Sequence, residues 1–591
     1  MMHHRHDVLS YRGNIGGSGP HHSGGRFIME KMHQGSPNTR DGVPVKVSLV
    51  QVSSPHHYAL WNALSVDTLA GHLRGVFLES DVQVSVDRIR SDQDMERFLD
   101  SLALLPDVIG ISAELGSLDW TVQLLKGIRS HRFDGGHRPL VVLGSVLPTC
   151  LPGVFLKEYP EAIVVKGEGE EALQGIVDFV RGKKTLDEVP SLVYRKGDER
   201  TTTARRPPDL STLEYPPALD TIAEVLHHDG NVLVETSRGC PWSSCAYCAI
   251  RASRHGKGWE PLPKKRVEAN LEQLVRAGVH EFEFADADIL GGIEDHHLDR
   301  VRWLCGVLNR LQANSGRKIS FRAFLTPQIF CKPGQLEVSD GVEGVFRDLK
   351  DAGMSRAYIG IESGSESQLR RYHRSTTPAQ LEYAIHLLRD EIGVAIDVGF
   401  LMFDPDLTLD EMLENIAFFE RLDLFDANQW PFRPIRLVPE TPMCKQMRKQ
   451  GRLGKFNHDL LAYQYVFKDP RVQEIHDTVD ALSAETRDIF YALKVVAKLQ
   501  FDGKEGRPET NFADKMVKAN AHIYIALMSN LAKALKDGPT DGVSIVDQAR
   551  LGIHNLLEKI LHEVQEGSLQ AHAAFLMPKL ERCSSQHRIM Q

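Results

Sequence analysis

The chain has 591 residues, more than a single hydrophobic core usually organises, so we expect about two to four domains. Its hydrophobic content of 42% and charged content of 25% are ordinary for a soluble globular protein. The net charge of −9 argues against a general binder of nucleic acid or of anionic membranes. The sequence has no apolar run long enough to span a bilayer and no signal-peptide core. Eight cysteines, three of them clustered, do not form the pattern of a secreted disulfide framework, so we predict a cytoplasmic protein with reduced thiols.

The N-terminal third of the chain changes character near residue 44. Residues 1–43 are rich in Gly, Ser and His, which predicts a disordered leader. Beyond them, short apolar runs alternate with amphipathic stretches, a pattern typical of buried parallel strands with helices between them. The expected strands are residues 45–52, 82–89, 107–112, 140–145 and 162–167. We therefore predict an α/β fold that begins with a five-stranded, doubly wound, Rossmann-like sheet over residues 44–190, whose loops at the strand carboxyl ends bind a ligand.

A second alternating series follows a proline-containing, charged connector, which predicts a linker over residues 191–230. Six further strand-like segments are separated by helical patterns. They are residues 231–237, 280–286, 318–324, 356–363, 395–403 and 432–438. This predicts a partial (β/α)6 parallel barrel over residues 231–455, with its chemistry at the strand carboxyl ends. The strand signal then stops, and residues 456–591 predict a helical C-terminal region.

Three cysteines lie within nine residues directly after the first predicted barrel strand, in SRGCPWSSCAYCAIR (237–251). Cys240, Cys245 and Cys248 are suited to binding iron or zinc as thiolates. A structural zinc site usually takes a fourth Cys or His from a second short pair, and the sequence has no second C-x-x-C. Three thiols without an evident fourth ligand favour an iron–sulfur cluster with one open iron, although a zinc knuckle or chance clustering stays an alternative.

These features resemble the radical S-adenosylmethionine (SAM) superfamily, and the sheet in front of the barrel resembles its cobalamin-binding branch. The resemblance extends over about residues 45–455 and keeps the family's order of segments. It is carried by LGSVLPTCLPGVFLKEYPEAIVVKGEGEEAL (143–173), ETSRGCPWSSCAYC (235–248), YIGIESGSESQLRRYHRSTT (358–377), GFLMFDPDLTLDEMLEN (399–415) and RLVPETPMCKQMRKQGRL (436–453). One departure is an extra residue between the first two cysteines, where the family usually has C-x-x-x-C-x-x-C.

The resemblance implies a site at the mouth of the barrel. The three cysteines would ligate a 4Fe–4S cluster, and SAM would chelate its fourth iron. Tyr247 would lie beside the adenine, although packing inside the barrel is an equal alternative. The other candidate SAM-binding residues, each with a structural alternative, are Asp286, Asp288, Arg322 and Glu362.

The predicted sheet lacks both a G-x-G-x-x-G turn and the D-x-H-x-x-G motif of histidine-ligated cobalamin domains. His57, in the loop after the first strand, is a candidate ligand of cobalt, although a solvated loop histidine is the more common case. Other residues follow later strands and would line the cobalamin-binding edge, where small side chains permit close backbone approach. They are Ser112, Glu114, Gly144, Ser145, Gly167, Glu168 and Gly169.

The resemblance implies a cobalamin-dependent radical SAM methyltransferase that methylates an unactivated carbon, or phosphorus, of a small biosynthetic substrate or a peptide. In the family, reduced cluster and SAM generate a 5′-deoxyadenosyl radical, and cobalamin carries the methyl group. The electron would come from a donor such as flavodoxin or ferredoxin. Non-radical methyl transfer, a radical cyclisation or rearrangement, and a non-catalytic cobalamin and cluster sensor are the alternatives.

Overall fold

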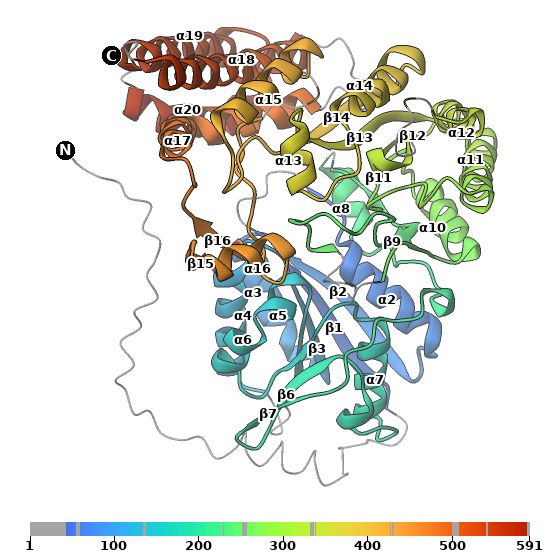
Figure 1. The fold of residues 1–591 in the computed structure, drawn as a ribbon. Coiled ribbons are helices and arrows are strands. Elements are labelled where there is room, and N and C mark those ends of the chain that lie inside the picture. The colour runs from blue at the N-terminus through green and yellow to red at the C-terminus, as the bar shows by residue number, and fades with distance from the viewer. Residues whose placement is uncertain are drawn as a thin grey trace, which may run out of the picture.

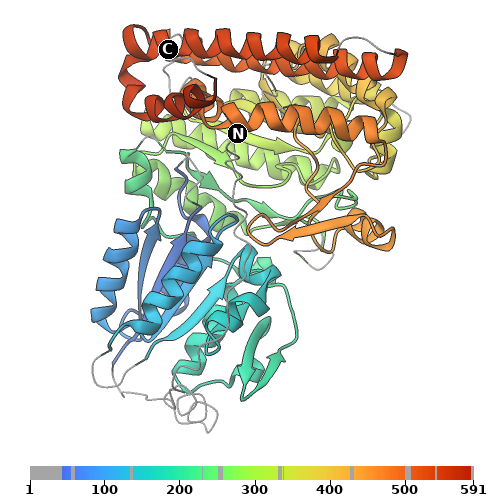
Figure 2. The same cartoon turned by 90° about the vertical axis from the view of Figure 1, so that its left-hand side faces the viewer.

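The computed structural model describes residues 43–54, 60–133, 138–228, 230–250, 254, 257–330, 336, 338–425, 427, 431–498, 508–538 and 542–587. Residues 1–42 of the predicted leader, and His57, lie outside these residues. The described chain builds a sheet domain at one end, a parallel barrel sheet in the middle and a layer of long helices at the other end (Figures 1 and 2). This arrangement confirms the predicted fold class.

The N-terminal domain is a seven-stranded sheet in the order β2-β1-β3-β4-β5-β6-β7. Its parallel strands are β1 (Val45–Val52), β2 (Val82–Ile89), β3 (Val108–Ala113), β4 (Leu140–Gly144) and β5 (Ile163–Val165). One face packs against α3 (Asp92–Ser101), α4 (Leu118–Ser130) and α6 (Pro152–Glu158), and the other against α2 (Leu64–Val76) and α7 (Glu170–Val180). A short helix, α5 (Val146–Cys150), follows β4. Apolar side chains therefore cover both faces, as a doubly wound sheet requires.

The sheet extends further along the chain than the sequence predicted. Strands β6 (Leu192–Lys196) and β7 (Glu199–Thr202) add to it in antiparallel pairs, so the beginning of the predicted linker 191–230 is part of the sheet. Leu192, Val193 and Tyr194 are almost fully buried, and this burial drives the extra pairing. This apolar run is short and is followed at once by charged residues, so the sequence pattern did not predict a strand here.

The barrel sheet has the order β14-β13-β12-β11-β8, with parallel strands throughout. These strands are β8 (Leu233–Val234), β11 (Glu281–Phe284), β12 (Ser320–Leu325), β13 (Met354–Glu362) and β14 (Ala395–Phe400). The helices between and after them are α10 (Lys264–Arg276), α11 (Asp295–Ser315), α12 (Asp340–Asp351), α13 (Glu366–Arg371), α14 (Pro378–His386) and α15 (Leu409–Arg421). A short antiparallel pair, β9 (Ser237–Arg238) with β10 (Glu260–Pro261), and helix α8 (Ile222–His227) lie at the junction with the N-terminal sheet.

The sixth predicted barrel strand, 432–438, differs from the prediction. In the described residues it forms only isolated bridges, one of them the parallel bridge between Phe403 and Pro434. A proline cannot donate a backbone hydrogen bond, which explains why the strand does not continue into a ladder here. The segment nevertheless occupies the next position beside β14, because Ile435 N donates to Phe403 O over 2.8 Å.

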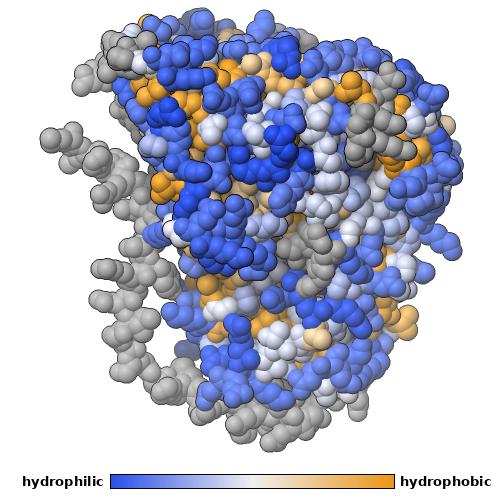
Figure 3. All heavy atoms as spheres, in the orientation of Figure 1, coloured by the Kyte–Doolittle hydropathy of each residue, from blue (hydrophilic) through white to orange (hydrophobic). Residues whose placement is uncertain are grey.

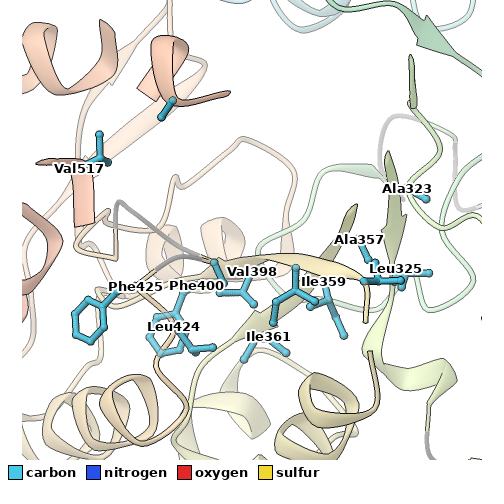
Figure 4. Packing of buried hydrophobic residues seen from close by; sticks show 14 of the residues in the cluster. Ala323, Leu325, Ala357, Ile359, Ile361, Val398, Phe400, Leu424, Phe425 and Val517 are labelled. Carbon is cyan, nitrogen blue, oxygen red and sulfur yellow. The ribbon is translucent and has the colours of Figure 1, made fainter. Parts of the chain in front are cut away.

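The remaining chain is mainly helical. It comprises α16 (Pro442–Lys449), the hairpin β15 (Leu453–Asn457) and β16 (Ala462–Tyr465), and the helices α17 (Pro470–Lys498), α18 (Pro508–Asp537), α19 (Gly542–Glu566) and α20 (Ala573–His587). The long helices pack directly on the barrel, and the two share one hydrophobic cluster. Figure 4 shows barrel side chains of this cluster, such as Ile359 and Phe400, together with Val517 of α18. The face in Figure 3 is mostly hydrophilic, and no described helix combines the length and apolarity needed to cross a membrane.

Candidate functional site

The cysteine loop begins directly after β9 and is held by backbone hydrogen bonds from two other segments. Ala246 N donates to Tyr372 O over 3.0 Å, and Met443 N donates to Ala246 O over 2.8 Å. The Trp242 indole also donates to His373 O over 3.0 Å. These bonds fix the middle of the loop between the end of α13 and the start of α16, so the thiols lie at the mouth of the barrel.

The three thiols of this loop are free and partly buried. Burial, together with smaller contributions from the charges of Cys245 and Cys240, raises the pKa of Cys248 to about 11, so the three thiols lie within electrostatic reach of one another. No three His, Cys, Asp or Glu side chains in the described chain converge on a single metal ion. A 4Fe–4S cluster needs no such convergence, because its thiolates bind different irons. Three neighbouring free thiols in a constrained loop therefore fit the predicted cluster.

Tyr247 and Glu362 meet beside Cys245. The Tyr247 hydroxyl hydrogen-bonds to Glu362, and burial followed by the Glu362 charge raises the pKa of Tyr247 well above its ordinary value. Its ring packs edge-on against Tyr372, with centroids 5.3 Å apart. Glu362 ends β13 with a φ of 68°, a left-handed conformation that costs a non-glycine residue about 1 kcal/mol or more. Such strain is typical of residues held in place at a functional site.

Arg374 completes this group, and sequence analysis missed it. Its Nη1 donates to Cys245 Sγ over 3.3 Å, and its Nη2 donates to Gly360 O. Burial opposes its charge, but Tyr247, Glu362 and Cys245 outweigh burial and raise the pKa of Arg374. Arg374 lies within the stretch 358–377 that carried the resemblance. The sequence around a loop arginine does not indicate which distant residue it contacts, so its contact with Cys245 could not be predicted.

Asp286 and Asp288 are buried in the loop after β11, where backbone N–H groups and hydroxyls donate hydrogen bonds to their oxygens. Asp286 accepts hydrogen bonds from Thr236 N over 3.0 Å and from the Ser237 hydroxyl over 2.5 Å. Asp288 accepts from the backbone N–H groups of Leu290, Gly291 and Thr326. Burial raises their pKa values to about 7 and about 6, respectively. In this geometry both carboxylates organise loops at the barrel mouth.

Arg322 of β12 forms ion pairs with two glutamates of the neighbouring strand β11. Its guanidinium lies 3.4 Å from Glu281 and 3.9 Å from Glu283. The side chain is largely buried. Its partners on β11 therefore hold it within the barrel sheet, and its predicted contact with SAM stays a prediction.

A cavity of about 490 Å³ lies between the ligand edge of the N-terminal sheet and the loops of the barrel. Most of the predicted cobalamin-binding residues line it: Ser112, Gly144, Ser145, Gly167, Glu168 and Gly169. Residues on the barrel side include Arg238 and Gly239, immediately before the first cysteine. Glu114 instead accepts a hydrogen bond from Gln51 over 2.8 Å, outside the cavity wall. The cavity thus reaches from the sheet to the start of the cysteine loop.

The wall formed by Gly144 and Ser145 leaves room for a ligand. A Cβ built on Gly144 would meet no atom within 4 Å. Ser145 has φ 78° and ψ −169°, a region that is essentially restricted to glycine. Open space next to a strained, small polar residue fits a bulky ligand that approaches the backbone closely, as a corrin or its nucleotide tail would.

A charged network closes the cavity where the two domains meet. Arg238 binds Glu170 over 2.6 Å and Glu235 over 2.9 Å, and Arg254 binds Glu168 over 3.1 Å. Burial alone would raise the pKa of Glu170, but the charge of Arg238 and its hydrogen bond outweigh burial and hold that pKa at about 2. Sequence analysis singled out only Glu168 of these residues. The sequence did contain opposite charges in two segments that carried the resemblance: glutamates in GEGEEAL and an arginine in SRGC.

Comparisons with known proteins agree with this geometry. The radical SAM superfamily matches residues 234–419. The 4'-phospho-dehydrooxetanocin synthase of Priestia megaterium is 30% identical over 76% of this chain and 61% of its own length. An uncharacterized methyltransferase of Pyrococcus horikoshii is 27% identical over 54% of this chain and 65% of its own length. The chain thus spans less than two thirds of these relatives.

Among solved structures, the cobalamin-dependent SAM radical enzyme OxsB, with aqua-cobalamin and SAM bound, superposes with a TM-score of 0.76. The match covers 92% of this chain and 84% of that one. At 21% identity it establishes that the folds are similar. A doubly wound sheet whose ligand edge faces three cysteines at a barrel mouth is the arrangement expected of a radical SAM protein with an additional ligand-binding domain. Residues 234–419 thus match the radical SAM superfamily, and the relatives and the fold agree with the predicted resemblance to its cobalamin-binding branch.

Proposed function

We propose that the chain is a cobalamin-dependent radical SAM methyltransferase acting on an unactivated carbon, or phosphorus, of a small biosynthetic substrate. The observation that supports this most directly is the cavity wall formed by Arg238 and Gly239, which leads into Cys240. A ligand in the cavity and a cluster on the cysteines would share that wall. When bound, the cofactors supply a substrate radical derived from SAM and a methyl group carried on cobalt.

The residues of this chain divide into two groups under this proposal. Cys240, Cys245 and Cys248 hold the 4Fe–4S cluster, and Arg374 donates to Cys245 to orient that thiolate. Tyr247 and Glu362 form the polar wall where SAM would bind, together with the predicted contacts of Asp286, Asp288 and Arg322. The residues lining the cavity bind cobalamin, and His57 stays a candidate outside the described residues.

The substrate is proposed to bind inside the barrel. Strand β13 alternates between buried and accessible side chains: Ala357 and Ile359 are fully buried, whereas Tyr358 between them is 39% exposed. Its ring packs against Phe324 of β12, with centroids 5.0 Å apart. An accessible aromatic surface within the sheet suits a small molecule or one side chain of a peptide.

A second candidate is a radical cyclisation or rearrangement on the same site. Two relatives favour it: the dehydrooxetanocin synthase and an anaerobic magnesium-protoporphyrin IX monomethyl ester cyclase of Cereibacter sphaeroides, which is 24% identical over 56% of this chain and 53% of its own length. Non-radical methyl transfer uses the same cofactors. These reactions differ in the fate of SAM, which makes them separable by product analysis.

We further propose cytoplasmic localisation, reduction by a flavodoxin or ferredoxin, and no role in binding nucleic acid or membrane. The cysteines that the structure describes are all free thiols, which supports a reducing compartment. The net charge of −9 supports the absence of a nucleic-acid partner.

The test is metal content followed by the fate of SAM. Protein purified anaerobically from cells supplied with cobalamin should hold about four irons and about one cobalt per chain. A variant with all three cysteines changed to Ala should lose iron and keep cobalt. Under reduction, 5′-deoxyadenosine with S-adenosylhomocysteine indicates radical methylation, and 5′-deoxyadenosine alone indicates rearrangement. S-adenosylhomocysteine alone indicates non-radical transfer. Iron without cobalt, even after incubation with hydroxocobalamin, would contradict the proposal.

A further inference from the structure

The start of the cysteine loop is anchored on the N-terminal domain. The Arg238 side chain is only 12% exposed, and its Nη2 lies 2.6 Å from Glu170 Oε1. Glu170 is the first residue of α7, and its side chain is 3% exposed. Because Arg238 is two residues before Cys240, a buried ion pair with the other domain fixes the point at which the loop begins. Removing one partner of such a buried pair leaves the other charge uncompensated.

The chain just beyond the loop is anchored on the same segment. Arg254 Nε donates to Glu168 Oε1 over 3.1 Å, and its Nη1 donates to Arg238 O over 2.8 Å. Its Nη2 donates to Glu260 Oε2 over 2.6 Å. One guanidinium therefore ties together the far end of the loop, the backbone at its beginning and the carboxylate of the N-terminal domain.

The anchoring residues also face the cavity. Glu168, Glu170, Arg238 and Arg254 all line it. Glu168 Oε2 and Arg238 Nη1 are buried and make no hydrogen bond with the described residues, although Arg238 Nη1 lies 3.6 Å from Glu168 Oε1 in an ion pair. A buried polar atom without a hydrogen bond is costly, so a ligand that offers one donor and one acceptor would satisfy both. Carboxamide groups, which fringe a corrin ring, have both functions.

We propose that the segment 167–170 is a shared positioning element through which cobalamin in the cavity and the iron–sulfur cluster on the cysteine loop bind cooperatively. Its two carboxylates contact the loop on one side and the cavity on the other. A ligand that orders Glu168 also orders Arg254 and Arg238, and therefore both ends of the loop. By reciprocity, a loop ordered by the cluster presents a better-formed cavity. The identity of the cavity ligand rests on the proposed function.

The experiment measures coupling between the two sites in the full chain. The dissociation constant of hydroxocobalamin is determined anaerobically by absorbance for protein with and without a reconstituted cluster. The cluster should tighten hydroxocobalamin binding on the order of tenfold, within the usual range of coupling between sites. In Glu168→Gln this ratio should fall towards one.

Glu171→Gln is the matched control. Glu171 is the adjacent carboxylate and forms a partly exposed ion pair with Arg206 over 3.0 Å, inside the N-terminal domain. This variant should keep the wild-type ratio. If Glu168→Gln is misfolded by circular dichroism, Arg254→Lys replaces it, because lysine keeps the charge and loses the forked geometry.

The outcomes separate the proposals. A purely structural role would weaken both affinities and leave their ratio unchanged, which would overturn the coupling. Equal hydroxocobalamin affinity with and without the cluster in the wild-type chain would also overturn it, while leaving the proposed function intact. No hydroxocobalamin binding in either form would overturn the proposed function and the coupling together.

Discussion

The strained conformation of Ser145 provides the sharpest test of the cavity wall. Ser145 has φ 78° and ψ −169°, a backbone conformation that is essentially limited to glycine. Adopting it costs a residue with a Cβ about 1–3 kcal/mol. Ser145→Gly removes this strain but adds roughly 0.5–1 kcal/mol of backbone entropy loss on folding. We therefore expect the free energy of unfolding to rise by about 1 kcal/mol. Since the chain has several domains, the readout is slower amide exchange in peptides covering β4 and α5, by mass spectrometry.

Ser145→Ala is the control, because alanine keeps the Cβ and the strain but removes the hydroxyl. It should exchange at the wild-type rate. If Ser145→Gly protects β4 and α5 no better than Ser145→Ala, the backbone at this position is not strained and our reasoning fails. If the hydroxyl donates to cobalamin, both variants should weaken hydroxocobalamin binding by about 0.5–1.5 kcal/mol, and Ser145→Gly then gains stability at the expense of affinity.

Three further perturbations probe the cysteine loop and its anchors. Gly239→Ala should abolish stable iron binding, because the new Cβ would lie 2.0 Å from Gly258 O at a φ of +88°, whereas Gly258→Ala, with nothing within 4 Å, should keep its iron after anaerobic reconstitution. Arg374→Met should lower iron retention several-fold and alter the electron paramagnetic resonance spectrum of the reduced cluster, because Cys245 loses a charged donor. Glu170, with a pKa of about 2 against 4.5 in the unfolded chain, stabilises the fold above about pH 4.5, and this stability is lost as the pH falls towards 2. Acid titration followed by circular dichroism should show a shallower loss in Glu170→Gln.

Each of these has a contradicting result. Iron bound equally by the two glycine variants would mean that the loop tolerates the clash. An unchanged spectrum in Arg374→Met would remove its contact with the thiolate. An acid transition of Glu170→Gln as steep as that of the wild-type chain would show that the ion pair with Arg238 does not govern stability in this range.

The fold could be predicted from local patterns, because buried parallel strands leave apolar runs that helices separate. Strands β1 to β5, β8 and β11 to β14 follow that rule. Strand β6 did not, since Leu192, Val193 and Tyr194 give too short a run. The apolar pattern of residues 432–438 predicts a strand, but Pro434 limits the backbone hydrogen bonds that the segment can form with its neighbour.

The site was predictable where its chemistry is local. Three thiols within nine residues indicate a metal or cluster site, and small residues at strand ends indicate the ligand edge of the sheet. Asp286 and Asp288 illustrate the limit: an acidic residue after a strand has the same letter whether it faces a ligand or accepts backbone hydrogen bonds. The pair of Arg238 and Glu170 spans 68 residues and two domains, so no window of sequence contains both partners.

The distribution of hydrophobic cores divides the chain differently from its sequence segments. The N-terminal sheet has its own clusters on its two faces, whereas the barrel and the C-terminal helices share one. The molecule is therefore built from two hydrophobic pieces, and deleting the long helices would expose apolar side chains of the barrel. Charged and hydrogen-bonded side chains line much of the seam between the pieces. Substituting the polar pairs at this seam would therefore alter how the domains meet without opening a cavity in either core.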